Sequence, residues 1–266
     1  MKLWLNGHLR DSDEPAIAAD DRGLLMGDGL YETLLVRNGR PARLAAHLER
    51  LRRGAAVIGL PLPDIEFAAA MQQVLAANRL LEGSLRLTVT RGAAPRGIAP
   101  PAVPSPTAMI AVAAAAPPPP PARCIVATRT RRNEHSPLAG IKHLNCLDSI
   151  LARIEAGERD ADDAILLNSA GQVAEATAAN VFVVLAGRLL TPPVADGALP
   201  GIRRAEIVAR GAVEVSLTAD DLRRAEAIFL TNSLGVRPLC RIDGRTLAAD
   251  VGLLWRDALE FPEDRA

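Results

Sequence analysis

Five consecutive prolines, Pro117-Pro118-Pro119-Pro120-Pro121, stand near the middle of this chain of 266 residues. Such a run lacks N–H donors and favours an extended polyproline II conformation, which makes it a stiff connector. We therefore expect an N-terminal lobe over 1–116 and a C-terminal lobe over 122–266, joined by a linker over 117–121. The alternative is a long loop inside one domain.

Both sides of this linker mix strand and helix patterns. Alternating apolar residues predict strands, and apolar residues at helical spacing predict amphipathic helices. The expected N-terminal elements are a hairpin around Asn6-Gly7, strands over 30–36, 85–90 and 107–113, and helices over 44–58 and 65–81, the second capped by Asp64. The expected C-terminal elements are strands over 124–128, 163–168, 181–185 and 225–231, and helices over 144–156, 203–211 and 251–259. The predicted fold class is α/β (α+β) in two lobes.

Charge and composition exclude several classes of partner. The chain has 31 basic and 31 acidic residues and a net charge of zero, which argues against nucleic-acid binding. The N-terminus turns polar too soon for a signal peptide, and the longest apolar run, 108–116, is about half a membrane span. The three cysteines, at 124, 146 and 240, lack metal-ligand spacing and leave at least one unpaired. We expect a cytoplasmic protein with no metal and no membrane contact.

Lysine is rare in this chain, which contains only Lys2 and Lys142. Lys142 lies in Gly140-Ile141-Lys142-His143-Leu144-Asn145, among apolar residues. Arginine keeps its proton in proteins, whereas a desolvated lysine loses it and becomes a nucleophile. The alternative is a surface lysine at the start of a helix, where a cation is unfavourable. Lys142 is therefore the candidate catalytic residue.

Other segments offer an acid and phosphate donors. Glu175 precedes an apolar strand and is either a surface turn residue or a buried acid with a cationic partner. The sequence Leu199-Pro200-Gly201-Ile202-Arg203 opens a helix, whose first N–H groups can hold an anion. Thr231-Asn232-Ser233 follows a strand and offers further hydrogen-bond donors. The guanidinium group of Arg50 could bind a phosphate with two hydrogen bonds, and the alternative is an exposed arginine on a helix. An amine, an acid and phosphate donors together are what pyridoxal 5′-phosphate (PLP) requires of a protein.

The order of these segments resembles the class IV (fold-type IV) PLP-dependent aminotransferase family, which includes D-amino-acid and branched-chain transaminases and aminodeoxychorismate lyase. The resemblance covers nearly the whole chain. It implies two α/β lobes with the cofactor between them, and a homodimer. The segments that carry it are Asp21-Arg22-Gly23, Gly27-Asp28-Gly29-Leu30-Tyr31-Glu32-Thr33, His47-Leu48-Glu49-Arg50-Leu51, Gly140 to Asn145, Glu175 with Asn180-Val181-Phe182, Leu199 to Ile202, and Thr231-Asn232-Ser233.

The resemblance also implies roles for single residues. Lys142 would be the Schiff-base lysine, Glu175 the partner of the pyridine nitrogen, and Leu199 a residue packed against the ring. The remaining cofactor-binding residues, several of them around the phosphate, would be Arg50, Asn180, Gly201, Ile202, Arg203, Asn232 and Ser233. Two positions depart from the family pattern: Arg203 stands where relatives often have threonine, and Cys146 where the lyases often have arginine.

The substrate has more than one interpretation. Three motifs, at 27–33, 142–145 and 231–233, are most similar to 4-amino-4-deoxychorismate lyase, which forms p-aminobenzoate and pyruvate for folate biosynthesis. Arg96 and Tyr31 resemble the substrate-binding pair of D-amino-acid transaminases, but Ile98 stands where those enzymes carry histidine. The third interpretation is an inactive homologue that binds a partner, against which the retention of Lys142 argues.

Overall fold

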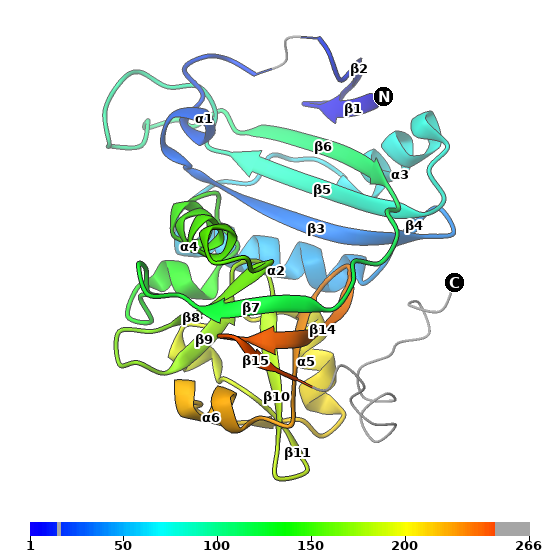
Figure 1. Cartoon of the computed structure of the whole chain (residues 1–266). Helices are drawn as coiled ribbons and strands as arrows, with labels where there is room; N and C mark the ends of the chain where they lie inside the picture. Colours follow the sequence, from blue (N-terminus) through cyan, green and yellow to red (C-terminus); the bar gives the residue numbers. More distant parts are fainter. Residues whose placement is uncertain (15–16, 248–266) are drawn as a thin grey trace. The chain divides into compact units, whose positions relative to one another are not determined.

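The protein is described here by a computed structural model that covers residues 1–14 and 17–247 (Figure 1), so the helix expected over 251–259 lies outside the described residues. Internal contacts divide the chain into two units. The N-terminal unit comprises Met1–Pro117 and Ile141–Asn145, and the C-terminal unit comprises Pro118–Gly140 and the residues from Cys146 onward. Both units combine sheet and helices, which confirms the predicted α/β class.

The N-terminal unit is built on a six-stranded sheet with the strand order β2-β1-β6-β5-β3-β4 (Figure 1). All of its neighbouring strands are antiparallel. Two hairpins turn at Asn6-Gly7 and Asn38-Gly39, where all four residues have positive φ, as two-residue hairpin turns require. The elements are β1 (Lys2–Leu5), β2 (His8–Asp11), α1 (Arg22–Met26), β3 (Gly29–Arg37), β4 (Arg40–Pro41), α2 (Leu44–Val57), α3 (Phe67–Asn78), β5 (Gly83–Thr90) and β6 (Thr107–Ala114).

The two faces of β3 have different environments. Leu30, Glu32 and Leu34 alternate along the strand and are buried, whereas Tyr31 and Thr33 on the other face are half-buried. Helix α2 packs against β3 and contributes the buried residues His47, Arg50, Leu51, Gly54 and Ala55. This face of the sheet is thus a core that also contains charged groups.

The beginnings of two expected helices are wrong. Helix α3 starts at Phe67 and not at residue 65, and its N-cap is Glu66 rather than Asp64. The chain turns just before the helix, because the N–H of Ile65 donates to the Pro63 carbonyl and the N–H of Phe67 donates to the Ile65 carbonyl. The helix expected over 144–156 is α4 (Leu147–Glu158) and starts three residues later.

The segment before α4 is extended, because it joins the sheet of the N-terminal unit. The N–H of Tyr31 donates to the carbonyl of Lys142, and the N–H of Leu144 donates to the carbonyl of Gly29, each at 3.0 Å. Leu30 and His143 form an antiparallel bridge between these bonds. Residues 141–145, expected in the C-terminal lobe, therefore extend the edge of β3 instead of beginning a helix.

The C-terminal unit contains a nine-stranded mixed sheet with the path β12-β11-β10-β13-β14-β7-β8-β9 and with β15 paired to β14. The strands are β7 (Ala122–Val126), β8 (Asp163–Leu167), β9 (Val173–Ala176), β10 (Asn180–Leu185), β11 (Arg188–Thr191), β12 (Val213–Glu214), β13 (Ala227–Asn232), β14 (Gly235–Ile242) and β15 (Arg245–Thr246). The helices besides α4 are α5 (Ile202–Ala209), α6 (Ala219–Arg224) and the short 3₁₀ turns over 137–140 and 194–196.

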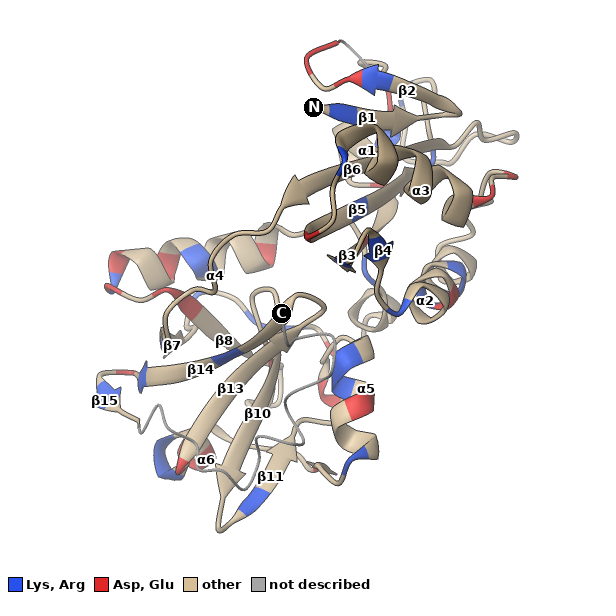
Figure 2. Cartoon of the chain, turned by 90° about the vertical axis from the view of Figure 1, so that its right-hand side faces the viewer, with Lys and Arg blue, Asp and Glu red and all other residues tan. Residues whose placement is uncertain are grey.

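Strands β10 and β13 form the apolar centre of this unit. Neither strand contains a charged residue, whereas the helices α5 and α6 carry many (Figure 2). The two strands pair antiparallel, with Asn180 opposite Thr231 at one end. This register places two polar residues side by side where the apolar strands meet the connecting loops.

Candidate functional site

Lys142 lies beside Tyr31 in the N-terminal unit. Its Nζ is 3.4 Å from the Tyr31 hydroxyl and 4.4 Å from the centroid of the ring. The two residues are opposite each other on paired strands, so their side chains project from the same face of the sheet. The sheet thus fixes the only amine in mid-chain against the only tyrosine of the protein.

Arg86 contacts the same ring, and the sequence analysis did not identify it. Its Cζ is 3.7 Å from the centroid of Tyr31. On β5, Leu85, Leu87 and Val89 point into the core, so Arg86 falls on the opposite face together with Thr88. The alternation of β5 could have placed Arg86 on an exposed face, but only the strand pairing brings it to Tyr31.

Arg50 lies in a buried cluster with Glu32 and His47. Its Nε and Nη2 donate to the two carboxylate oxygens of Glu32 at 2.8 and 2.6 Å, and His47 Nδ1 is 2.6 Å from Glu32 Oε2. Burial raises the pKa of Glu32, but the hydrogen bonds from Arg50 and His47 outweigh it and hold that pKa below its ordinary value. The structure thus shows how Arg50 is oriented, and its contact with phosphate stays a prediction.

His47 gives this cluster a dependence on pH. Burial lowers the pKa of His47 below its ordinary value of 6.5, although the bond to Glu32 opposes the shift. As pH falls below 6.5, the unfolded chain binds a proton at His47 before the folded chain does, so stability decreases. Glu32, whose pKa is also lowered, acts in the same direction below pH 4.5.

We therefore expect the denaturant midpoint of the wild-type protein to be lower at pH 5.5 than at pH 7.5, and to change less in the His47→Gln variant. Unfolding curves at the two pH values measure this difference. The variant His8→Gln is the control, because His8 is exposed on β2 and should leave the pH dependence unchanged. Equal dependence in wild type and His47→Gln would contradict the assignment.

Arg96, a predicted substrate ligand, belongs to an exposed loop that a buried arginine holds in place. Arg22 donates to the carbonyls of Gly97 and Ile98 at 2.8 Å each, and its Nε donates to Asp28 at 2.8 Å. Arg91 bonds to the same Asp28 oxygen at 2.8 Å. Burial raises the pKa of Asp28, but Arg91 and Arg22 outweigh it and keep the pKa lowered. The loop is thus held by hydrogen bonds from Arg22, which an ion pair with Asp28 orients, and the role of Arg96 stays a prediction.

Glu175 is held firmly in the C-terminal unit. Its Oε2 accepts a hydrogen bond from the N–H of Leu199 at 2.9 Å, and its Oε1 is 3.1 Å from Arg132 Nε. The Glu175 side chain is only 13% exposed. Of the two arrangements that the sequence leaves open, the structure shows the acid with a cationic partner and not a surface turn.

Leu199 is also fixed from its other side, next to the start of α5. Asn180 Nδ2 donates to the Leu199 carbonyl at 2.9 Å. Gly201 caps α5 without a side-chain hydrogen bond, and a Cβ there would meet Asn180 Oδ1 at 1.9 Å. A side chain at this position would therefore displace the Asn180 amide, and Ile202 and Arg203 form the first turn of the helix, whose backbone N–H groups face its N-terminal end.

Thr231 adds a donor that the sequence analysis treated only as part of a motif. Thr231 is 1% exposed, and its hydroxyl has no hydrogen-bond partner within residues 1–14 and 17–247. It lies opposite Asn180 across the β10–β13 pair. Asn232 is exposed and bonds to the Ala178 carbonyl at 3.3 Å, while Ser233 begins the turn to β14. The Thr231 hydroxyl can therefore donate a hydrogen bond to a bound water or ligand.

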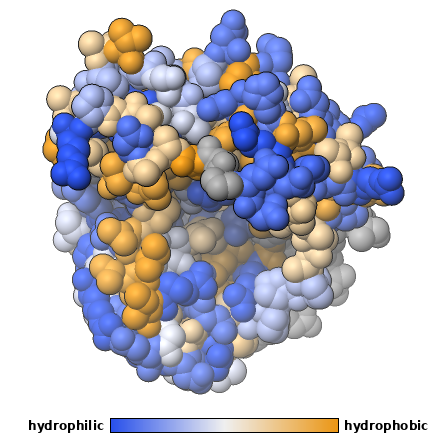
Figure 3. Space-filling model, turned by 90° about the horizontal axis from the view of Figure 1, so that it is seen from above, coloured by the Kyte–Doolittle hydropathy of each residue, from blue (hydrophilic) through white to orange (hydrophobic). Residues whose placement is uncertain are grey.

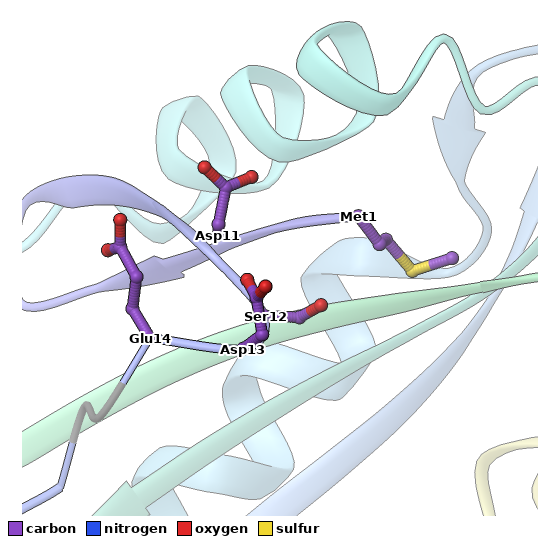
Figure 4. A pocket seen from close by; sticks show the side chains of 5 residues that line it. All are labelled: Met1, Asp11, Ser12, Asp13 and Glu14. Atoms are coloured by element: carbon purple, nitrogen blue, oxygen red, sulfur yellow. The ribbon is translucent and has the colours of Figure 1, made fainter.

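Each unit, taken by itself, contains groups that suit PLP. The C-terminal unit presents a fixed carboxylate, an uncapped helix N-terminus and the Thr231 hydroxyl, which suit a protonated ring nitrogen and a phosphate. The N-terminal unit presents the amine of Lys142 beside a phenol. A separate depression lined by Met1, Asp11, Ser12, Asp13 and Glu14 shares no residue with these groups (Figure 4).

Comparison with protein families supports this fit. The sequence profile described as amino-transferase class IV matches residues 29–242. A protein of Methanocaldococcus jannaschii assigned as a branched-chain-amino-acid aminotransferase is 34% identical over 258 residues, which is 93% of this chain and 90% of its own. A D-alanine aminotransferase of Bacillus licheniformis is 31% identical over 258 residues, or 94% and 91% of the two chains.

Solved structures of this kind include both lyases and aminotransferases. The 4-amino-4-deoxychorismate lyase from Pseudomonas aeruginosa is 32% identical, with a TM-score of 0.79, and the match covers 97% of this chain and 100% of the lyase. A hypothetical aminotransferase from Mycobacterium tuberculosis in its PLP-bound form is 26% identical, with a TM-score of 0.81, and both chains are covered completely.

Proposed function

Because this chain belongs to the amino-transferase class IV family and is a PLP-dependent enzyme, we propose that it is a 4-amino-4-deoxychorismate lyase. Its products would be p-aminobenzoate and pyruvate, in folate biosynthesis. The contact of Lys142 with Tyr31 at 3.4 Å supports chemistry at this amine in either reaction, and the three motifs at 27–33, 142–145 and 231–233 favour the lyase. The lyase from P. aeruginosa supports the choice of reaction.

Each group in the two units has a role in this proposal. When bound, PLP supplies an electron sink for negative charge on the substrate carbon. Lys142 would hold the cofactor covalently, and its free amine would move a proton as a general base or acid with Tyr31 beside it. Glu175 would keep the ring nitrogen protonated, since Leu199 and Arg132 fix its carboxylate. The proposed phosphate donors are Arg50, Thr231, Asn232, Ser233 and the amides of Ile202 and Arg203.

An amino-acid transaminase of the D-amino-acid or branched-chain type is the second candidate. The observation in its favour is the loop of Arg96, which Arg22 holds by its backbone carbonyls. Arg96 with Tyr31 would then bind the carboxylate of the amino acid. The D-alanine aminotransferase of B. licheniformis is a relative with this activity.

Two measurements on the PLP-loaded enzyme distinguish the candidates. We expect p-aminobenzoate and pyruvate from 4-amino-4-deoxychorismate, with the cofactor absorbance unchanged after turnover. D-alanine and L-leucine, added without a keto acid, should convert little of the cofactor to its pyridoxamine form. Complete conversion by either amino acid, with no p-aminobenzoate formed, would overturn the lyase in favour of the transaminase. No reaction in either assay would indicate an inactive homologue.

We also propose that the enzyme is a cytoplasmic homodimer. Leu24 and Leu25 on α1 are 66% and 56% exposed, and Ile98 and Val103 on the Arg96 loop are 85% and 87% exposed. Figure 3 shows such apolar side chains on the surface among hydrophilic ones. Exposed apolar groups of this kind suit contact with a second copy. Cys124 is a buried thiol, which suits a reducing compartment.

No helix in the described part of the chain is both long and apolar enough to cross a membrane.

A further inference from the structure

We propose that Arg132 is a positioning residue for a proton: its charge keeps Glu175 ionised, so that the proton between Glu175 and the cofactor ring stays on the ring nitrogen. The inference rests on the proposed function insofar as Glu175 faces that nitrogen. It does not depend on whether the reaction is elimination or transamination, because both need a ring that accepts negative charge.

Arg132 is fixed within the C-terminal unit by its backbone and by two carbonyl groups. Its backbone N–H donates to the Leu167 carbonyl at 2.9 Å, and Arg132 forms a parallel bridge with Asn168. In the side chain, Nε donates to the Gly197 carbonyl and Nη2 to the Ala139 carbonyl, each at 3.2 Å. The guanidinium therefore has a defined position, which a solvated surface arginine lacks.

Gly197 allows the close approach of the arginine stem. Its φ is +97°, in the left-handed region that glycine adopts without strain. A Cβ at this position would lie 3.3 Å from the Cβ of Arg132 and 3.5 Å from that of Glu134. The short turn over 194–196 can thus end directly against Arg132, which places the Gly197 carbonyl within reach of Nε.

The same Nε contacts Glu175 in a place largely withdrawn from water. It lies 3.1 Å from Oε1 of Glu175, and the two side chains are 15% and 13% exposed. The other carboxylate oxygen, Oε2, accepts the N–H of Leu199 at 2.9 Å. A nearby cation and a hydrogen-bond donor favour the ionised form of a carboxylate, whereas burial alone favours its neutral form. Arg132 thus opposes the effect of burial on Glu175.

This contact influences where a proton shared with a pyridine ring lies. In a site with little water, a neutral pair of carboxylic acid and pyridine costs less to bury than a carboxylate beside a pyridinium ion. A cation in contact with the carboxylate favours the second arrangement, because it stabilises the negative charge. With Arg132 in place, Glu175 therefore remains the anion, and the ring nitrogen keeps the proton that makes the ring an electron sink.

The alternative is that Arg132 is only a structural brace. Its bond to Ala139 holds the turn over 137–140, and Ala139 is three residues before Lys142 along the chain. Loss of a brace would impair the attachment of the cofactor to Lys142. Loss of a charge would move the proton and leave the cofactor attached, so the two roles differ in properties that can be observed without turnover.

NMR of the ring nitrogen, in enzyme loaded with isotopically labelled PLP, shows directly whether that nitrogen carries a proton. We expect the wild-type signal at the position of a pyridinium ion. In Arg132→Met, the ratio of protonated to neutral ring should fall about 10- to 1000-fold, the effect of one adjacent opposite charge on a carboxylate, and the signal should move towards neutral pyridine. Visible absorbance should show that the cofactor is still attached. Arg132→Lys, which keeps the charge, should keep most of the pyridinium signal.

Arg129→Met is the matched control, because Arg129 is an exposed arginine three residues away that pairs with Glu158 on the surface. It should leave the signal unchanged. In a Glu175→Gln background, Arg132→Met should cause no further change, since Arg132 acts through Glu175. If Arg132→Met does not bind the cofactor, Arg132→Gln takes its place, because glutamine can still donate to the Gly197 carbonyl.

A pyridinium signal in Arg132→Met equal to that of wild type would overturn the inference. Loss of cofactor attachment in both neutral variants would also overturn it, since that result assigns Arg132 to the brace. Failure of the lyase assay, with a ring-nitrogen signal that still depends on Arg132, would overturn only the proposed reaction.

Discussion

The Lys142→Ala variant should lose covalent attachment of the cofactor and nearly all turnover, a loss of several orders of magnitude. The only other lysine, Lys2, lies on β1 in an ion pair with Asp11 at 2.7 Å, so no neighbouring lysine can replace Lys142. A covalent nucleophile that also moves protons contributes in two ways, and proton transfer alone is worth about 10²- to 10⁴-fold. Turnover and visible absorbance of wild type and variant measure the effect.

Borohydride reduction followed by peptide mapping identifies the attachment site directly. The cofactor should be found as a secondary amine on Lys142. Lys2→Ala is the control variant, and it should keep both the absorbance and the activity. Label on Lys2, or on no lysine, would remove Lys142 from the mechanism.

The Glu175→Gln variant should bind the cofactor and lose activity on the order of 100-fold or more. Glutamine has the same shape and can still accept the bond from the N–H of Leu199, so the loop should keep its position. What disappears is the negative charge, which in wild type lies 3.1 Å from Arg132 and would keep the ring nitrogen of the cofactor protonated.

The comparison needs a second charge-neutral variant of the same unit. Glu158→Gln serves this purpose, because Glu158 is half-exposed on α4 and pairs with Arg129 on the surface. It should have full activity. If Glu175→Gln were as active as Glu158→Gln, Glu175 would have no role in the reaction. If Glu175→Gln failed to bind the cofactor, the role of Glu175 would be cofactor binding and not the reaction.

Much of the fold follows from local patterns. The Asn6-Gly7 turn lies where the sequence places it, because a two-residue hairpin needs residues that tolerate positive φ. The apolar periodicity of α2 and the alternation of β5 and β6 also predict these elements nearly to their ends. These signals lie within one element, so the sequence alone carries them.

The candidate site could be predicted only as residue types. The rarity of lysine singled out Lys142, and the prediction that Gly201 opens a helix is confirmed by its position as the N-cap of α5. The sequence misplaced residues 144–146 in a helix, since apolar spacing continues through them, while the N–H of Leu144 donates to Gly29 on a strand more than 100 residues away. The spacing of apolar residues within a segment contains no information about a distant strand that binds it.

The sequence by itself determined the α/β class, the Asn6-Gly7 hairpin, the family resemblance and the amine at position 142. Only the tertiary structure decided that Lys142 and Arg86 both contact Tyr31, that Glu32 holds Arg50, and that the buried hydroxyl of Thr231 has no partner among the described residues. The physical reason is the range of the interactions. Turn conformation and amphipathicity are properties of neighbouring residues, whereas strand register brings together residues that no local pattern connects.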